Sequence, residues 1–175
     1  MSDSKNIPTG ALTPAGRILP CPGSVPNCVS TSSTSDLYGP AFASPDSPAD
    51  AAAALDASIQ SLHATLLADS DPATPPGSVF RAYRVPRPRG GALSSGGATD
   101  DTLEVLIKAG GGGGGGEGAA GGSTVLYRSV AGGAAYVFPF QTPILDSVQR
   151  DRVTALFRVG LGWRPVGCDL LECYE

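Results

Sequence analysis

The sequence has few of the residues that carry out catalysis and bind metals. Its 175 residues include one histidine, His63, one tryptophan and four cysteines. Cys21 and Cys28 are too far apart for zinc ligands, which usually lie about two to four residues apart beside a second pair. A Cys-Xaa-Xaa-Cys redox motif and a Gly-Xaa-Ser-Xaa-Gly nucleophile motif are both missing. These absences predict no catalytic residue, no metal and no cofactor.

Positive charge and long apolar runs are also scarce. Sixteen acidic and twelve basic side chains give a net charge of −4, which argues against a sequence-independent nucleic-acid binder. No run approaches the roughly 20 apolar residues that span a bilayer. The opening MSDSKNIPTG has neither the apolar run of a signal peptide nor the arginine-rich face of a transit peptide. We expect a soluble protein that binds no nucleic acid and does not span a membrane.

A short loop between two cysteines, CPGSVPNC at residues 21–28, is the first feature that is present. Its prolines, glycine and asparagine exclude a helix or a central strand. The loop is covalently closed if the compartment is oxidising, and it carries two idle thiols if it is not. Four cysteines allow three pairings, and proximity in sequence favours Cys21–Cys28, with Cys168–Cys173 as a second pair.

Glycine and proline divide the chain into a domain with tails and insertions. We expect a disordered tail over 1–20, a single domain over 21–163 and a C-terminal tail over 164–175. Low-complexity insertions are expected at 86–101 and 109–122. The glycine run in the second insertion lacks the Lys-Ser/Thr of a P-loop and the strand–turn–helix context of a dinucleotide site, so it predicts only a lengthened hairpin loop.

Two helices are predicted. The first, over 48–69, follows a capping Ser47 and a proline, and its apolar stripe is Leu55, Ile59, Leu62 and Leu66. The second, over 147–160, ends at two glycines.

Near-alternation of apolar and polar residues predicts strands at 78–85, 102–108, 123–130 and 134–140. The expected fold is α+β: a single antiparallel sheet of about four strands with both helices packed on one face, after an irregular, disulfide-looped N-terminal segment.

A charged set spans the third strand and the start of the last helix: Arg128, Asp146, Arg150 and Arg152. Asp146 and Arg150 have the spacing of a helical ion pair. The set is either a network that fixes the helix to the sheet or a site for an anionic ligand or partner; an unrecognised enzyme would also use it. Asp100 and Asp101, in a glycine-rich loop, are expected to be solvated.

Aromatic residues alternate on the strand over 134–140, where Pro139 favours an edge position. Aromatic residues close to arginines are typical of protein interfaces. The predicted partner-binding residues are therefore Tyr136, Phe138, Phe140, Arg128 and Arg152. In the rival interpretation, Tyr136 and Phe138 line a pocket between the sheet and the helices.

Two segments resemble the family catalogued as domain of unknown function 1499: CPGSVPNCVSTSS at 21–33, and TVLYRSVAGGAAYVFPFQTPILDSVQRDRV at 124–153 followed by LGW. The matching positions are Cys21, Pro22, Pro26, Asn27, Cys28, Val29, Ser30, Arg128, Ser129, Asp146, Arg150 and Arg152. Gln149 stands where bacterial members usually have asparagine, and Cys168 and Cys173 are additions. The Tyr-Val-Phe-Pro stretch and Gly162–Trp163 are most similar to the plant and green-algal branch.

The resemblance implies a location rather than a reaction, because the family has no agreed activity. Plant-type members are similar to thylakoid-lumen proteins, a compartment that holds auxiliary factors of photosystem II assembly and repair. We therefore expect a non-enzymatic accessory protein of the chloroplast thylakoid lumen that docks on a membrane protein complex, with photosystem II favoured. This location requires a targeting segment absent from this chain. The alternative is a carrier of a small apolar or anionic ligand.

Overall fold

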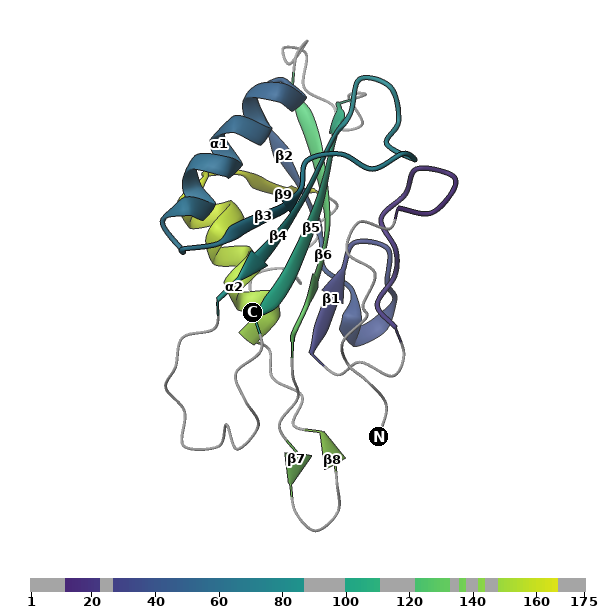
Figure 1. Cartoon of the computed structure of the whole chain (residues 1–175), viewed down its shortest axis with the longest axis vertical. Coiled ribbons are helices and arrows are strands. Elements are labelled where there is room, and N and C mark those ends of the chain that lie inside the picture. The colour runs from purple at the N-terminus through teal and green to yellow at the C-terminus, as the bar shows by residue number, and fades with distance from the viewer. Residues whose placement is uncertain are drawn as a thin grey trace.

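The computed structural model of the chain describes residues 12–22, 27–86, 100–110, 122–132, 136–137, 142–143 and 148–166. Within these residues the main element is a seven-stranded antiparallel sheet (Figure 1). Its strands are β1 (Cys28–Ser30), β2 (Ala41–Ser44), β3 (Thr65–Ala68), β4 (Val79–Val85), β5 (Asp101–Ala109), β6 (Ser123–Val130) and β9 (Arg164–Val166). A separate two-stranded ribbon joins β7 (Tyr136–Val137) to β8 (Thr142–Pro143).

The three longest strands, β4, β5 and β6, run side by side in the middle of the sheet. Strand β3 pairs with β4 at one edge. On the other side of β6, its first residues pair with β2 and its last residues pair with β1. Strand β9 pairs with β2 and forms the second edge. Strand β6 therefore pairs with two strands from early in the sequence, and the last described strand, β9, joins the same sheet through β2.

The expectation of about four strands is wrong. The predicted strands at 78–85, 102–108 and 123–130 correspond to β4, β5 and β6, but four further short strands complete the sheet. Each of those four has only three or four residues, too few for alternation to be recognised in sequence. The described part of the predicted strand over 134–140 is β7, which pairs with β8 and not with the main sheet.

Helix α1 (Pro48–Gln60) begins as predicted and ends earlier. The Ser47 hydroxyl caps it by accepting from the backbone N–H of Asp50. After the helix, His63 has a positive φ of 55°, and the chain continues as β3. The prediction of a helix over 48–69 is wrong beyond Gln60, because a spacing of four residues between leucines fits the period of a strand as well as that of a helix.

The second helical region is an α-helix that continues as a π-helix. Helix α2 (Val148–Thr154) continues as the π-helical segment η2 (Ala155–Gly160), which matches the predicted span of 147–160. A single 3₁₀ turn, η1 (Ser35–Leu37), precedes β2. Helices α1 and α2 both lie on the same face of the sheet (Figure 1).

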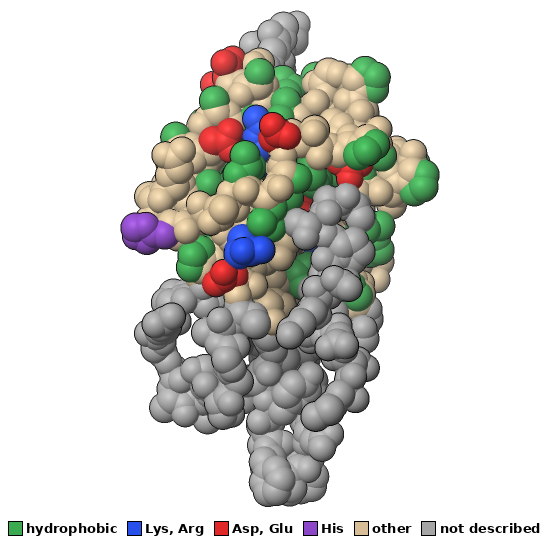
Figure 2. Space-filling model, viewed as in Figure 1, with side chains coloured by type: hydrophobic (Ala, Val, Ile, Leu, Met, Phe, Trp, Pro, Cys, Tyr) green, Lys and Arg blue, Asp and Glu red, His purple; other side chains and the backbone are tan. Residues whose placement is uncertain are grey.

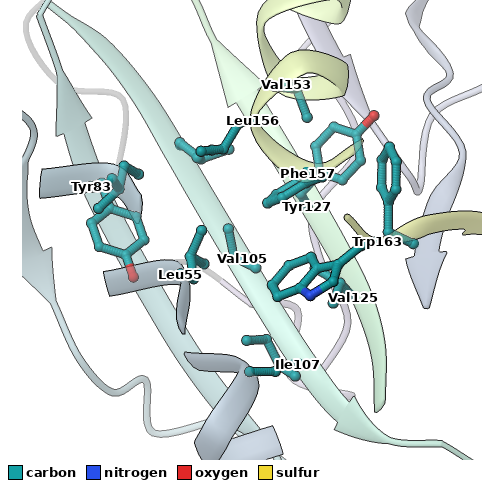
Figure 3. Packing of buried hydrophobic residues seen from close by; sticks show 14 of the residues in the cluster. Leu55, Tyr83, Val105, Ile107, Val125, Tyr127, Val153, Leu156, Phe157 and Trp163 are labelled. Carbon is teal, nitrogen blue, oxygen red and sulfur yellow. The ribbon is translucent and has the colours of Figure 1, made fainter. Parts of the chain in front are cut away.

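The main core lies between these helices and the sheet (Figure 3). Its helix side chains include Leu55 and Ile59 from α1 and Phe157 from η2, all with exposed fractions of 2% or less. The Phe157 ring lies 5.4 Å from the rings of both Tyr127 and Trp163. This aromatic contact fixes η2 against the centre of the sheet.

Neither α1 nor α2 lies on the other face of the sheet, which is covered by the irregular segment of residues 12–22 (Figure 1). Leu12 and Ile18 pack there on Phe80, Ala82 and Leu106. Leu12 and Ile18 fall within the tail over 1–20 that was expected to be disordered, and in the structure both belong to this second apolar cluster. Packed chain likewise continues past the expected boundary at residue 163, because β9 is part of the sheet.

Candidate functional site

The predicted disulfide between Cys21 and Cys28 is confirmed, with the two Cα atoms 5.8 Å apart. Cys28 is buried on β1 and Cys21 ends the irregular segment, so the bond attaches that segment to the sheet. Two hydrogen bonds support the attachment: the Cys21 N–H donates to the Ser33 hydroxyl, and the Ser30 hydroxyl donates to the Leu19 carbonyl. Cys168 and Cys173 lie outside the described residues.

Arg128 forms a buried ion pair with Glu104 on the face that the irregular segment covers. The two residues are directly opposite each other on β6 and β5. Both Nε and Nη2 of Arg128 lie 2.7 Å from Oε2 of Glu104. The exposed fractions of the two side chains are 3% and 2%. A side chain this buried cannot contact a partner at the surface, so Arg128 has a structural position here.

Arg152 belongs to a different network, which joins α2 to the sheet around Asp101. Oδ2 of Asp101 accepts from Nη1 of Arg152 and from Nε2 of Gln149, both at 2.7 Å. Oδ1 of Asp101 accepts from the backbone N–H of Gly132 at 3.1 Å. Gln149 in turn accepts from the Ser129 hydroxyl. The structure thus contains a helix-to-sheet network, and Asp101, expected to be solvated, is its centre and is buried.

Arg150 belongs to neither of these ion pairs and instead contacts the backbone around η1. Its Nη2 donates to the carbonyl oxygens of Asp36 and Tyr38, at 2.6 and 3.0 Å. Arg150 therefore holds the η1 turn against α2. Its predicted helical partner, Asp146, lies outside the described residues. The predicted charged set is thus distributed over separate contacts rather than gathered in one site.

The aromatic part of the predicted partner-binding site is not described. Phe138 and Phe140 lie outside the described residues, and of Tyr136 only the backbone in β7 is described. These three positions stay predictions. Figure 2 shows one face of the molecule, on whose described part basic and acidic side chains are interspersed and not gathered into a patch.

A pocket of about 490 Å³ lies between the end of α1, the segment η2 and the sheet. Most of its lining is apolar, from Leu62, Val85, Leu103, Val153, Leu156 and Val159. The network of Asp101, Ser129, Gln149 and Arg152 forms its polar end. The rival interpretation placed a pocket between sheet and helices; Tyr136 and Phe138, which it assigned to the lining, are not among the described lining residues.

The rim of the pocket is apolar and open to solvent. Val159 has an exposed fraction of 83% and Leu62 of 44%. Val159 belongs to η2, and π-helical segments are rare and often occur at functional sites. Gly160 allows close approach of η2 to α1, because a Cβ atom at this position would lie 3.3 Å from the Ser58 hydroxyl. The pocket mouth is thus formed where the two helical segments meet.

Two buried tyrosines have strongly perturbed acidity, but neither lines the pocket. Burial, and then the hydrogen bond from the Tyr83 hydroxyl to Oδ1 of Asp56, raise the pKa of Tyr83. Burial likewise raises the pKa of Tyr127. Both phenols stay protonated at neutral pH, so neither acts as a general base.

The part of the chain that the structure describes contains neither a cluster of metal ligands nor a membrane-spanning helix. In this part of the chain, no three histidine, cysteine, aspartate or glutamate side chains are grouped as metal ligands. No helix within the described ranges is long and apolar enough to cross a membrane.

Sequence reasoning missed Asp101 and Gln149 as members of the polar end. Gln149 stood out only as a departure from the asparagine usual in bacterial members. Its position one turn before Arg152 on the same helix was the available signal. Asp101 gave no signal, since its partners are 48 and 51 residues away in sequence.

The chain matches no known protein family model, no curated protein and no solved structure. The resemblance to the family catalogued as domain of unknown function 1499 therefore stays a prediction.

Proposed function

We propose that this is a non-enzymatic binding protein whose pocket holds a small, largely apolar molecule. The observation that carries the proposal is the pocket itself. Its volume of about 490 Å³ falls within the roughly 300–1,000 Å³ of small-molecule sites, which are mostly apolar with a few placed polar groups. The carrier that the sequence left as an alternative is thus the function that the geometry supports best.

The exposed rim adds a thermodynamic reason. Protein interiors are close-packed, with few voids larger than a water molecule. Here an open apolar cavity is bordered by two solvent-exposed side chains, Leu62 and Val159. Contiguous exposed apolar surface commonly marks a binding site. An apolar molecule in the pocket removes this surface from water, which stabilises the bound state.

The test is to fill the pocket from its mouth. Ala155 lines the pocket and is solvent-exposed, so Ala155→Trp obstructs the cavity without a change in the core. The neutral fluorophore Nile red should bind wild-type protein saturably at one site, and Ala155→Trp should abolish this binding. Ala53→Trp is the matched control, because Ala53 is an exposed alanine of α1 outside the pocket. Equal binding by the wild type and Ala155→Trp contradicts the proposal.

A second candidate is the accessory role in the thylakoid lumen, docked on a membrane complex, with photosystem II favoured. The disulfide favours it, because structural disulfides belong to oxidising compartments. The proposed contacts are Tyr136, Phe138, Phe140 and Arg152, without Arg128. Affinity purification from thylakoids should enrich photosystem II subunits with the wild type and less with Phe138→Ala. Equal recovery with both proteins counts against docking through this face.

A further inference from the structure

Among the described residues at the polar end of the pocket, Arg152 is the charged, partly exposed side chain whose hydrogen-bond donors are not all in use. The carboxylate of Asp101 accepts from at least three groups, and the Ser129 hydroxyl donates to Gln149. The buried amide of Gln149 accepts from Ser129 and donates one N–H to Asp101. A guanidinium has five N–H donors, and Arg152 uses Nη1 toward Asp101. Within the described residues, no group accepts a hydrogen bond from its Nε or Nη2.

Exposure decides which charge a ligand meets. The Asp101 side chain has an exposed fraction of 4%, whereas that of Arg152 is 31%. The carboxylate lies behind its donors, and the guanidinium forms the accessible surface. The polar end of the pocket therefore presents N–H donors of a cation.

The part of the pocket lining that comes from α1 disfavours an anion. Ser58, Ser61 and Leu62 line the pocket at the C-terminal end of this helix. The C-terminal end of a helix carries a partial negative charge from its carbonyl groups. An anionic group is thus accommodated at the Arg152 end, and an apolar chain along the walls formed by Leu103, Leu156 and Val159.

We infer that the ligand is an amphipathic carboxylic acid, whose head binds Arg152 and whose hydrocarbon chain fills the apolar part of the pocket. The planar fork of a guanidinium matches the two oxygens of a carboxylate. This inference rests on the proposed function and adds the chemical class of the ligand. It also makes Arg152 the residue that determines specificity.

The experiment compares probes that share a chain and differ in the head group. Dodecanoate, dodecanol and dodecyltrimethylammonium, each below its critical micelle concentration, compete with Nile red for wild-type protein. Hydrogen bonds between charged groups contribute enough for roughly a tenfold to hundredfold difference in Kd. We therefore expect dodecanoate to bind at least tenfold more tightly than dodecanol, and the ammonium to bind most weakly.

Variants assign the preference to Arg152. Arg152→Gln should remove the preference for dodecanoate and leave the Kd of dodecanol within about twofold. Arg152→Lys should keep part of the preference. Arg84→Gln is the control, because Arg84 is exposed on β4 outside the pocket, and it should change neither Kd. If Arg152→Gln does not fold, the wild type still gives an answer, since added salt should reduce the preference for dodecanoate.

Three results overturn the inference. Equal affinity for dodecanol and dodecanoate shows an apolar pocket without head-group recognition and leaves the proposed function intact. Equal weakening of both probes by folded Arg152→Gln shows that Arg152 only supports the pocket. Failure of Nile red and of every probe to bind removes the proposed function together with the inference.

Discussion

Two arginine–carboxylate pairs of equal length lie on opposite faces of the sheet and have different roles. In each pair a nitrogen lies 2.7 Å from a carboxylate oxygen. Arg128 and Glu104 are both almost inaccessible, whereas Arg152 has an exposed fraction of 31%. Distance alone therefore does not distinguish a structural pair from one with donors available to a ligand; burial does.

The two faces of the sheet are also covered by different kinds of structure. Two helices lie over one face and share a continuous core with the sheet. Over the other face, the irregular segment contributes two buried apolar side chains, Leu12 and Ile18, and is attached through Cys21–Cys28. With little apolar area to bury, this segment depends on its covalent bond and on hydrogen bonds to the sheet. The Cys21–Cys28 bond thus holds this segment on the face of the sheet that also carries the buried ion pair.

The largest effect is expected from breaking the buried pair. Glu104→Gln leaves the guanidinium of Arg128 inside the protein without its anion, and such changes usually cost about 3–5 kcal/mol. Urea denaturation should show a decrease of this size in the free energy of unfolding.

The matched change on the other face is Arg152→Gln. Asp101 keeps its hydrogen bonds from Gln149 and Gly132, and the lost partner is partly solvated, so we expect a loss of only about 1 kcal/mol. Equal losses in the two variants would contradict the distinction between a sealed pair and an accessible one.

The second largest effect concerns the attachment of the irregular segment. The double change Cys21→Ala and Cys28→Ala opens a short loop and should lower the free energy of unfolding by about 2.5 kcal/mol on a chain-entropy estimate. Hydrogen exchange should become faster in residues 12–22 and stay unchanged in α1. Faster exchange in α1 with slow exchange in residues 12–22 would show that the disulfide does not hold this cover.

The third prediction tests the contact between α1 and β4. Tyr83→Phe removes the hydrogen bond to Asp56, and a bond to a charged group contributes about 1.5 kcal/mol or more. Asp56 keeps its 3.3 Å contact with Arg81 in this variant, so the helix should stay in place while the free energy of unfolding decreases.

The same tyrosine predicts a pH dependence. Its pKa is raised in the folded state, so the stabilisation is complete below the unfolded value of about 10 and is lost as the pH rises above it. Denaturation at pH 9 and pH 11 should show a larger decrease for the wild type than for Tyr83→Phe. An identical decrease in both proteins would show that the alkaline loss has another source.

The long, regular elements were predictable from sequence, and the contacts between distant residues were not. Strands β4 to β6 each have seven to nine residues, enough for the near-alternation of apolar and polar side chains to be recognised. Ser47 and Pro48 mark the start of α1. The pairing of Glu104 with Arg128 depends on the register of β5 and β6, and a shift by one residue would place Glu104 on the other face. Apolar pattern also cannot distinguish a filled core from a pocket, because Leu103 and Leu156 contribute to both.

The smallest effect is expected from the glycine run, which lies between β5 and β6 in the sequence. Strands β5 and β6 are paired as far as Ala109 and Ser123, and the Gly110 N–H then donates to the Gly122 carbonyl. Both glycines should be kept, since a Cβ atom on Gly122 would lie 2.8 Å from the Ser44 carbonyl oxygen. Replacing residues 111–121 with Asn-Gly then closes a two-residue hairpin.

Shorter loops cost less to close, by roughly 0.6 kcal/mol per halving of length. The free energy of unfolding should therefore rise by about 1 kcal/mol or less in this variant, with Nile red binding unchanged. A marked loss of stability or of binding would show that this run contributes to one of the two faces.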